Sequence, residues 1–251
     1  MRLTCLVVGM LAATSAMAAD GGPVAFRADA RVELDANGKA TKIEVPKDLP
    51  EAIRAFIEKR IGSYTFSPPE RDGVRGPAVT FLQLGACAIP TPEGYRLGLD
   101  LKGNGPRVDR PDGRLLVMPY PREAQMLRSE VSMTIVFYIE PDGTASLDTV
   151  RYSDGKSHVR DGFAALARNW VELIRFEPEQ LAGQPLRSQA EITFNYTIPT
   201  GRSRAFSRTS EIAKPDPQQI RQSTECKMAA GEASEPEVIA GDSPTRVLTS
   251  G

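Results

Sequence analysis

The chain has few of the residues that most often carry catalysis and metal binding. Its 251 residues include one histidine, three cysteines and one tryptophan. Activation of a serine or cysteine nucleophile would have to use His158, which we interpret as an exposed residue in the first turn of a helix. The cysteines form no close pair, and no second histidine could complete a zinc site. The sequence therefore predicts a protein without enzymatic activity, metal or cofactor.

The short motifs of common enzyme classes are also missing. No G-x-S-x-G elbow, phosphate-binding loop or dinucleotide fingerprint occurs in the chain. Gly241-Asp242-Ser243 is similar to the serine motif of some esterases, but we attribute it to chance because we expect the surrounding segment to be disordered. Glu140 and Asp142 lie in an expected hairpin turn, where exposure to solvent is a sufficient explanation for two carboxylates. No catalytic constellation is therefore predicted.

Neither sign of charge is in excess. The chain has 31 Lys and Arg against 32 Asp and Glu, which gives a formal net charge of −1. Proteins that bind nucleic acid or anionic membranes through electrostatics usually have a basic surface. We therefore expect no nucleic-acid partner.

Long apolar runs are lacking except near the first residue. Arg2 gives a positive start, residues 3–13 form an apolar middle, and Ala16-Met17-Ala18 offers a small-x-small cleavage site, as in a secretory signal peptide. The alternative is an uncleaved membrane anchor, but the apolar run is shorter than the ~20 residues that a bilayer requires. We expect residues 1–18 to be a signal peptide, with no transmembrane anchor after cleavage.

Export would change how the cysteines are interpreted. Cys5 would leave with the signal peptide, and Cys87 and Cys226 would remain in an oxidising compartment. A disulfide between them would close a long loop and contribute on the order of 4 to 5 kcal/mol in the chain-entropy model. The alternative is a buried Cys87 and a free Cys226 on a terminal tail.

The first half has the periodicities of a hairpin, a helix and two further strands. Apolar residues that alternate or run together predict strands over 28–34, 40–45, 79–89 and 95–101. Asn37 and Gly38 supply the turn of the hairpin. Asp48 and Glu51 have the spacing of a capping box for a helix that ends at Gly62. Residues 103–116 contain several glycines and prolines and are expected to be an inter-domain linker.

The second half has similar parts in a similar order. Its patterns predict helices over 121–130 and 157–174, and strands over 131–140, 147–152 and 190–198. Gly38 corresponds to Gly143, and Phe66-Ser67-Pro68 corresponds to the segment Phe176-Glu177-Pro178. We infer an internal duplication. The alternative is two unrelated α+β domains that share turn chemistry by chance.

The motifs of the second half resemble the C-terminal domain of TonB, a periplasmic protein that contacts outer-membrane transporters. The segments that carry the resemblance are Tyr120-Pro121 with Ala124, Phe137 with Pro141-Asp142-Gly143, the helix 163–174, and Arg175-Phe176-Glu177-Pro178. The family usually has a glycine where Val131 stands and an aromatic residue where Ile174 stands.

The resemblance implies an α+β fold with two tandem TonB C-terminal-like units, each a small antiparallel sheet packed with a helix. The expected organisation is a degenerate unit over 19–102, the linker 103–116, a second unit over 117–199, and a mostly disordered tail over 200–251.

The same resemblance implies a periplasmic, non-enzymatic protein-binding module that acts by β-strand addition. Its partners would be proteins or peptides such as outer-membrane TonB-dependent receptors, linking it to transport. The expected receiving edge is the last strand, represented by Ile192, Phe194, Tyr196 and Ile198. The alternative function is an envelope assembly protein whose paired units form a homodimer or larger oligomer.

Overall fold

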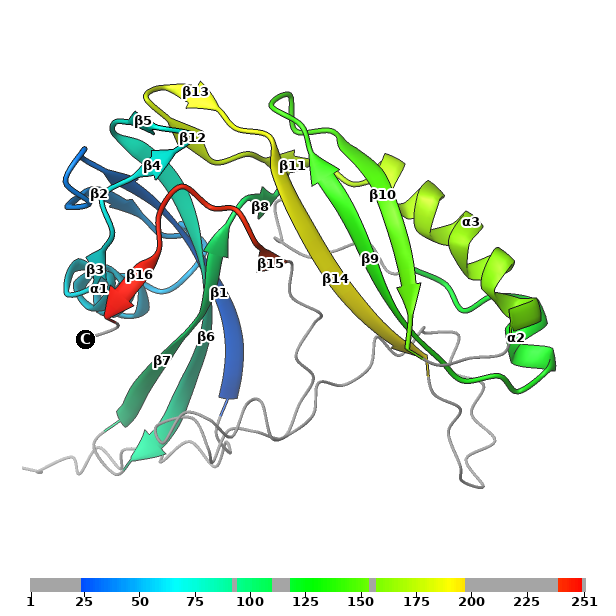
Figure 1. Ribbon diagram of the computed structural model, residues 1–251. Coiled ribbons are helices and arrows are strands. Elements are labelled where there is room, and N and C mark those ends of the chain that lie inside the picture. The colour runs from blue at the N-terminus through cyan, green and yellow to red at the C-terminus, as the bar shows by residue number, and fades with distance from the viewer. Residues whose placement is uncertain (1–23, 92–93, 110–117, 154–156, 197–238, 250–251) are drawn as a thin grey trace, which may run out of the picture.

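The computed structural model describes residues 24–91, 94–109, 118–153, 157–196 and 239–249. The expected signal peptide, Ile198 and Cys226 lie outside the described residues. In Figure 1 the helices α1 (Glu51–Gly62) and α3 (Ser157–Leu173) lie on opposite sides of the molecule, and the two largest sheets, of six and four strands, lie between them. Within the described segments, no helix has both the length and the apolar content required to cross a membrane.

The first half forms one sheet with a helix against it. Its main elements are β1 (Val24–Leu34), β2 (Ala40–Glu44), α1 (Glu51–Gly62), β6 (Ala78–Thr91) and β7 (Gly94–Gly105). The strand order is β13-β12-β6-β1-β2, in which β12 (Gln180–Leu181) and β13 (Gln184–Pro185) come from the second half, and β7 also pairs with β6. Ile57 and Ile61 of α1 pack on the apolar side of this sheet and are fully buried. An amphipathic helix packs on a sheet through one apolar stripe of this kind.

The second half forms a sheet of order β10-β9-β14-β15. Its elements are α2 (Arg122–Met126), β9 (Val131–Ile139), β10 (Ala145–Tyr152), α3 (Ser157–Leu173), β14 (Ser188–Tyr196) and β15 (Ile239–Ala240). Alternate residues of β9 and β14 point toward α3 and are buried with Phe163 and Trp170. The period of two in these strands therefore forms one apolar face, as predicted.

Short strands connect the two halves into one body. The hairpin of β12 (Gln180–Leu181) and β13 (Gln184–Pro185) comes from the second half, yet β12 pairs with β6. Likewise β8 (Arg107–Val108) pairs with β11 (Phe176–Glu177), and β16 (Val247–Thr249) pairs with β3 (Thr65–Phe66). The two units are therefore not independent of each other.

The elements of the two halves follow the same order. A strand pair, a helix, a short strand, a small hairpin and a long strand occur first as β1 to β6 and again as β9 to β14. The first small hairpin is β4 (Glu70–Arg71) with β5 (Val74–Arg75). Its turn, Asp72-Gly73, and the turn Ala182-Gly183 of the second hairpin both have positive φ at both residues, which is typical of a type I′ turn.

The capping box expected for the first helix was wrong. Pro50 is the N-cap residue of α1, and no side chain forms a capping hydrogen bond. The proline ring fixes φ near the value required at a helix start, so the chain enters the helix at Pro50, two residues after Asp48.

The linker expected over 103–116 was wrong in its first part. Gly103 and Gly105 are paired with Gln83 and Phe81 as the end of β7, and β8 follows directly. A glycine weakens an isolated strand, but a neighbouring strand that supplies regular hydrogen bonds can compensate for this loss. Residues 110–117 lie outside the described residues.

The disordered tail expected over 200–251 was wrong for its last part. Residues 239–249 include β15 and β16, and Thr245 is 1% exposed. This segment has few apolar residues, but its backbone pairs with strands from both halves. Such long-range pairing has no periodic signal in the tail itself.

Candidate functional site

The strand β14 has different neighbours on its two sides. On one side β9 pairs with it from Ser188 to Tyr196. On the other side β15 pairs only with Ala190 and Glu191. Beyond Glu191, no strand in the part of the chain that the structure describes covers this second side. The section of β14 from Ile192 to Tyr196 therefore presents an edge, which we call the open edge.

Two hydrogen bonds show which backbone groups point to the open edge. The Gln189 carbonyl accepts a hydrogen bond from the Gly241 amide at 3.3 Å, and the Gln189 amide donates to both carboxylate oxygens of Asp242 at 3.1 Å. In a strand, the amide and carbonyl of one residue point to the same side, and the side alternates along the chain. The backbone groups of Thr193 and Asn195 therefore point outward like those of Gln189.

The predicted site residues lie in this strand, but their side chains face inward. Ile192, Phe194 and Tyr196 are 1%, 5% and 6% exposed and pack in the core beside α3. By the same alternation, their backbone groups point to β9. The residues that could pair with an added strand are thus their neighbours Thr193 and Asn195. Because successive residues of a strand direct their backbone groups to opposite sides, the sequence would identify Thr193 and Asn195 once the backbone of one residue, such as Gln189, is known to point to the open edge.

The outer face of the sheet consists of polar side chains that bond across the strands. Ser132 donates to Asn195 at 2.6 Å, and the hydroxyl groups of Thr134 and Thr193 are 2.8 Å apart. Arg151 forms an ion pair with Glu191. Cross-strand pairs of this kind stabilise a sheet modestly and hold neighbouring strands in register. These bonds join side chains and do not use the outward backbone groups of Thr193 and Asn195.

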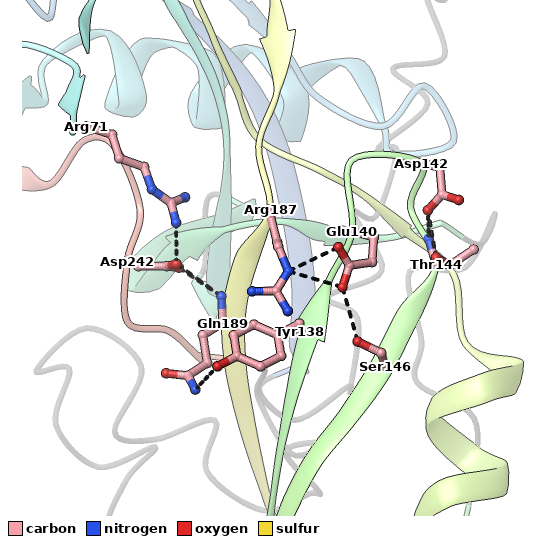
Figure 2. A network of polar contacts seen from close by, with 9 residues as sticks. All are labelled: Arg71, Tyr138, Glu140, Asp142, Thr144, Ser146, Arg187, Gln189 and Asp242. Carbon is pink, nitrogen blue, oxygen red and sulfur yellow. Dashed lines mark hydrogen bonds and ion pairs between the residues drawn. The ribbon is translucent and has the colours of Figure 1, made fainter. Parts of the chain in front are cut away.

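A second polar group lies nearer the turn of this sheet, as Figure 2 shows. The guanidinium of Arg187 lies over the Tyr138 ring, 3.6 Å from its centroid, and its Nε donates to Glu140 at 3.1 Å. The Tyr138 hydroxyl accepts a hydrogen bond from Gln189 at 3.3 Å. Glu140 thus has a structural partner, beyond the solvation that we expected for it.

The C-terminal segment links the start of β14 to the first half. Asp242 accepts a hydrogen bond from the Arg71 guanidinium at 2.7 Å and also binds the Gln189 amide (Figure 2). Two residues on, the Pro244 carbonyl accepts a hydrogen bond from the Glu70 amide at 2.9 Å. From the sequence alone, the motif Gly241-Asp242-Ser243 is attributed to chance. In the structure, this segment connects the two halves.

A buried carboxyl group lies at the same junction. Glu179 is fully buried, and its Oε1 accepts hydrogen bonds from the Thr80 hydroxyl at 2.5 Å and the Ser243 hydroxyl at 2.7 Å. Its Oε2 has no hydrogen-bond partner among the described residues. Burial raises the pKa of Glu179 to about 7, because the charged form loses its solvation. No apolar period in the surrounding polar loop indicates that Glu179 is buried.

The motif residues at the entry of the second unit stack on the end of β14. The rings of Tyr120 and Tyr196 are parallel to within 12°, with centroids 5.1 Å apart. The Tyr196 hydroxyl donates to the Met118 carbonyl at 3.2 Å, and burial raises the pKa of this phenol far above its usual range. Pro121 is the N-cap of α2. These residues therefore hold the end of β14 in place.

The remaining motif residues close the other end of the unit. The Arg175 guanidinium donates to the carbonyls of Glu172 and Ile174, each at 2.8 Å, at the C-terminus of α3. The Phe176 amide donates to the Gly143 carbonyl at 2.9 Å. Pro178 follows β11 and is half-buried. All of these residues have structural roles rather than chemical ones.

A family model describes the same part of the chain. The model for the Gram-negative bacterial TonB protein C-terminal matches residues 117–198. Residues 117–198 are a TonB C-terminal-like domain. The matched range includes α2, β9, β10, α3 and β14, and thus the open edge. Comparison with curated proteins and with solved structures gave no match.

The family that this model describes is a non-enzymatic, transport-associated one. Within the described ranges, no group of three or more His, Cys, Asp or Glu residues could hold a metal ion. Cys87 lies in β6 and is fully buried, whereas Cys226 is outside the described residues. The bridge between them stays a prediction.

Proposed function

We propose that this chain is a periplasmic protein-binding module that captures an extended segment of a partner at the open edge of β14. The observation that carries the proposal is that β15 covers only Ala190 and Glu191, so that Thr193 and Asn195 direct unpaired backbone groups outward among the described strands. An exposed row of amides and carbonyls is a ready template for another strand. The site would add a partner strand to the sheet without catalysis.

The family supplies the class of partner. TonB C-terminal domains interact with proteins such as outer-membrane receptors, and we propose the same class for this chain, in association with TonB-dependent transport. Net hydrogen-bond energies are only about 0.5–1.5 kcal/mol each in water. Two outward residues therefore predict weak binding unless side chains or further contacts contribute.

The strand of the first half that corresponds to β14 has no open edge of the same kind. We infer that residues 24–105 are a degenerate copy of the TonB C-terminal-like unit, in which β6 corresponds to β14. The side of β6 that corresponds to the open edge is taken by β7 from Phe81 to Thr91 and by β12 at Ala78 and Val79. A partner strand could therefore not pair with β6 on the side that corresponds to the open edge of β14.

The test is a titration with N-terminal peptides of outer-membrane TonB-dependent receptors, followed by amide chemical shifts of β14. Thr193→Pro removes the outward amide hydrogen while leaving the ladder to β9 intact, and proline is tolerated on edge strands. Thr193→Val is the matched control, because it loses the same hydroxyl but keeps the amide. We expect Thr193→Pro to weaken binding about three- to tenfold relative to Thr193→Val.

Two results would contradict this function. One is the absence of binding at about millimolar peptide, and the other is equal binding by both Thr193 variants. The alternative assembly function predicts a homodimer or larger species, which light scattering at several protein concentrations would detect.

A further inference from the structure

The C-terminal segment places a carboxylate at the beginning of the open edge. Both oxygens of Asp242 lie 3.1 Å from the Gln189 amide, which is the first outward amide of β14 beside β15. A carboxylate accepts hydrogen bonds and cannot donate them. It therefore satisfies the Gln189 amide, and it repels the carbonyl oxygen of any strand that approaches the same amide.

The first half of the chain holds this carboxylate in position. Arg71 donates to Asp242 at 2.7 Å, and the Arg71 and Asp242 side chains are only 24% and 33% exposed. The segment that follows is fixed by the Thr245 hydroxyl, which donates to the Ser67 carbonyl at 2.9 Å, and by the pairing of β16 with β3. Asp242 is thus attached to a different unit from the strand whose amide it binds.

We propose that Asp242 is a stop that sets where a partner strand can begin on β14. With β15 it excludes the partner from Gln189 to Glu191 and restricts pairing to the open edge from Ile192 to Tyr196. The occupant is one extended peptide segment that pairs with the outward backbone of Thr193 and Asn195. This inference rests on the proposed function, and it names a residue that determines the length of segment that is bound.

The physical basis is a competition for one amide. A hydrogen bond to an ionised acceptor is about twice as strong as a neutral one, so a backbone carbonyl from a partner would not displace Asp242 from Gln189 without a net loss. Without the carboxylate, the Gln189 amide becomes available, and a longer segment could continue along β14 if it also replaced β15. The stop thus favours short segments.

The experiment compares two peptides of alternating threonine and valine, blocked at both ends, of about five and about nine residues. They are titrated against the full chain, the Asp242→Ala variant and the control Asp148→Ala. Asp148 is an exposed residue of β10, so its substitution changes the net charge equally without affecting the edge. Amide hydrogen exchange of Gln189 and Thr193 is measured in the absence of peptide.

We expect Asp242→Ala to bind the longer peptide at least about fivefold more tightly than the unsubstituted chain and the shorter peptide equally well. The Gln189 amide should exchange at least about tenfold faster in this variant, while the Thr193 amide is fast in all three proteins. Asp148→Ala should match the unsubstituted chain in every measurement.

If the Gln189 amide exchanges at the same rate in Asp242→Ala as in the unsubstituted chain, the proposal that Asp242 is a stop is wrong, whatever affinities the two peptides show. Equal affinity of the unsubstituted chain and Asp242→Ala for the longer peptide would also overturn it, while binding itself would still support the proposed function. If no protein binds a peptide of either length or a receptor peptide, the proposed function fails, and the stop fails with it. Arg71→Ala keeps the Asp242 carboxylate but removes the guanidinium that holds it in position. The Gln189 amide of this variant should therefore exchange at a rate between those of the unsubstituted chain and Asp242→Ala.

Discussion

The carbonyl oxygen of Gly143 accepts a hydrogen bond from the amide of Phe176 at 2.9 Å, which joins the β9–β10 turn to the strand after α3. Gly143 has a φ of +80°, and a Cβ atom at this position would lie well inside van der Waals distance of the Phe176 carbonyl. In the first half, Gly38 has a φ of +82°, and a Cβ atom there would lie 2.6 Å from the Phe66 carbonyl oxygen. Both turns therefore require glycine, first because φ is positive and second because a Cβ atom would overlap the neighbouring carbonyl oxygen.

Substitution of Gly143 by alanine should destabilise the fold by about 2 to 3 kcal/mol, because the left-handed φ and the steric overlap add. Gly183→Ala is the matched control. Gly183 has a φ of +77°, but among the described residues, its chain neighbours aside, no atom lies within 4 Å of its expected Cβ, so only about 1 to 2 kcal/mol is expected. Urea unfolding of both variants measures the difference, and equal losses would contradict the steric argument.

Glu179 should make stability depend on pH. Its pKa is raised from 4.5 to about 7 in the fold by burial, so the folded protein keeps this proton longer than the unfolded chain does. The stabilising effect is complete below about pH 4.5 and is lost as the pH rises to about 7. The loss is about 3 kcal/mol by the linkage relation.

The measurement is urea unfolding at several pH values between 5 and 8, with Glu179→Gln as the comparison. Glutamine keeps an oxygen that can accept from Thr80 and Ser243, but it does not ionise. The difference in stability between the two proteins should therefore change across this window. A difference that is independent of pH would show that Glu179 does not titrate there.

The Tyr196 hydroxyl should contribute to stability through its bond to the Met118 carbonyl. Tyr196→Phe leaves this buried carbonyl without its donor and should cost about 1 kcal/mol. Tyr138→Phe is the control, because the Tyr138 hydroxyl is bonded to Gln189 at an exposed site, where a change within about 0.5 kcal/mol is expected. Thermal unfolding of the two variants distinguishes them, and equal shifts would contradict the assignment.

Cys87 and Cys226 are predicted to form a disulfide in the exported protein. Peptide mapping of the mature protein without reductant should recover one linked pair of peptides that contain these residues. Recovery of two free thiols would contradict the bridge. If it forms, the bridge ties the chain beyond β14 to β6, the strand that contains Cys87.

Local pattern predicted the regular elements well where one face of a strand or helix is buried. The strands 131–140 and 190–198 and the helix 157–174 correspond to β9, β14 and α3 within a few residues. Their apolar periods of two and of three to four are produced directly by burial of one side. Strands of only two residues, such as β8 and β15, are too short to have such a period and were not predicted.

The sequence by itself determined the α+β character and the TonB C-terminal motifs of residues 117–198. Only the tertiary structure decided that Thr193 and Asn195, rather than Ile192 and Phe194, direct their backbone outward, because that depends on the side on which β9 pairs. It also decided that Asp242, bonded to Gln189, and Glu179, bonded to Ser243, both lie at the junction of the halves. These contacts join residues far apart in the chain, and neither composition nor periodicity records which distant segments will pair.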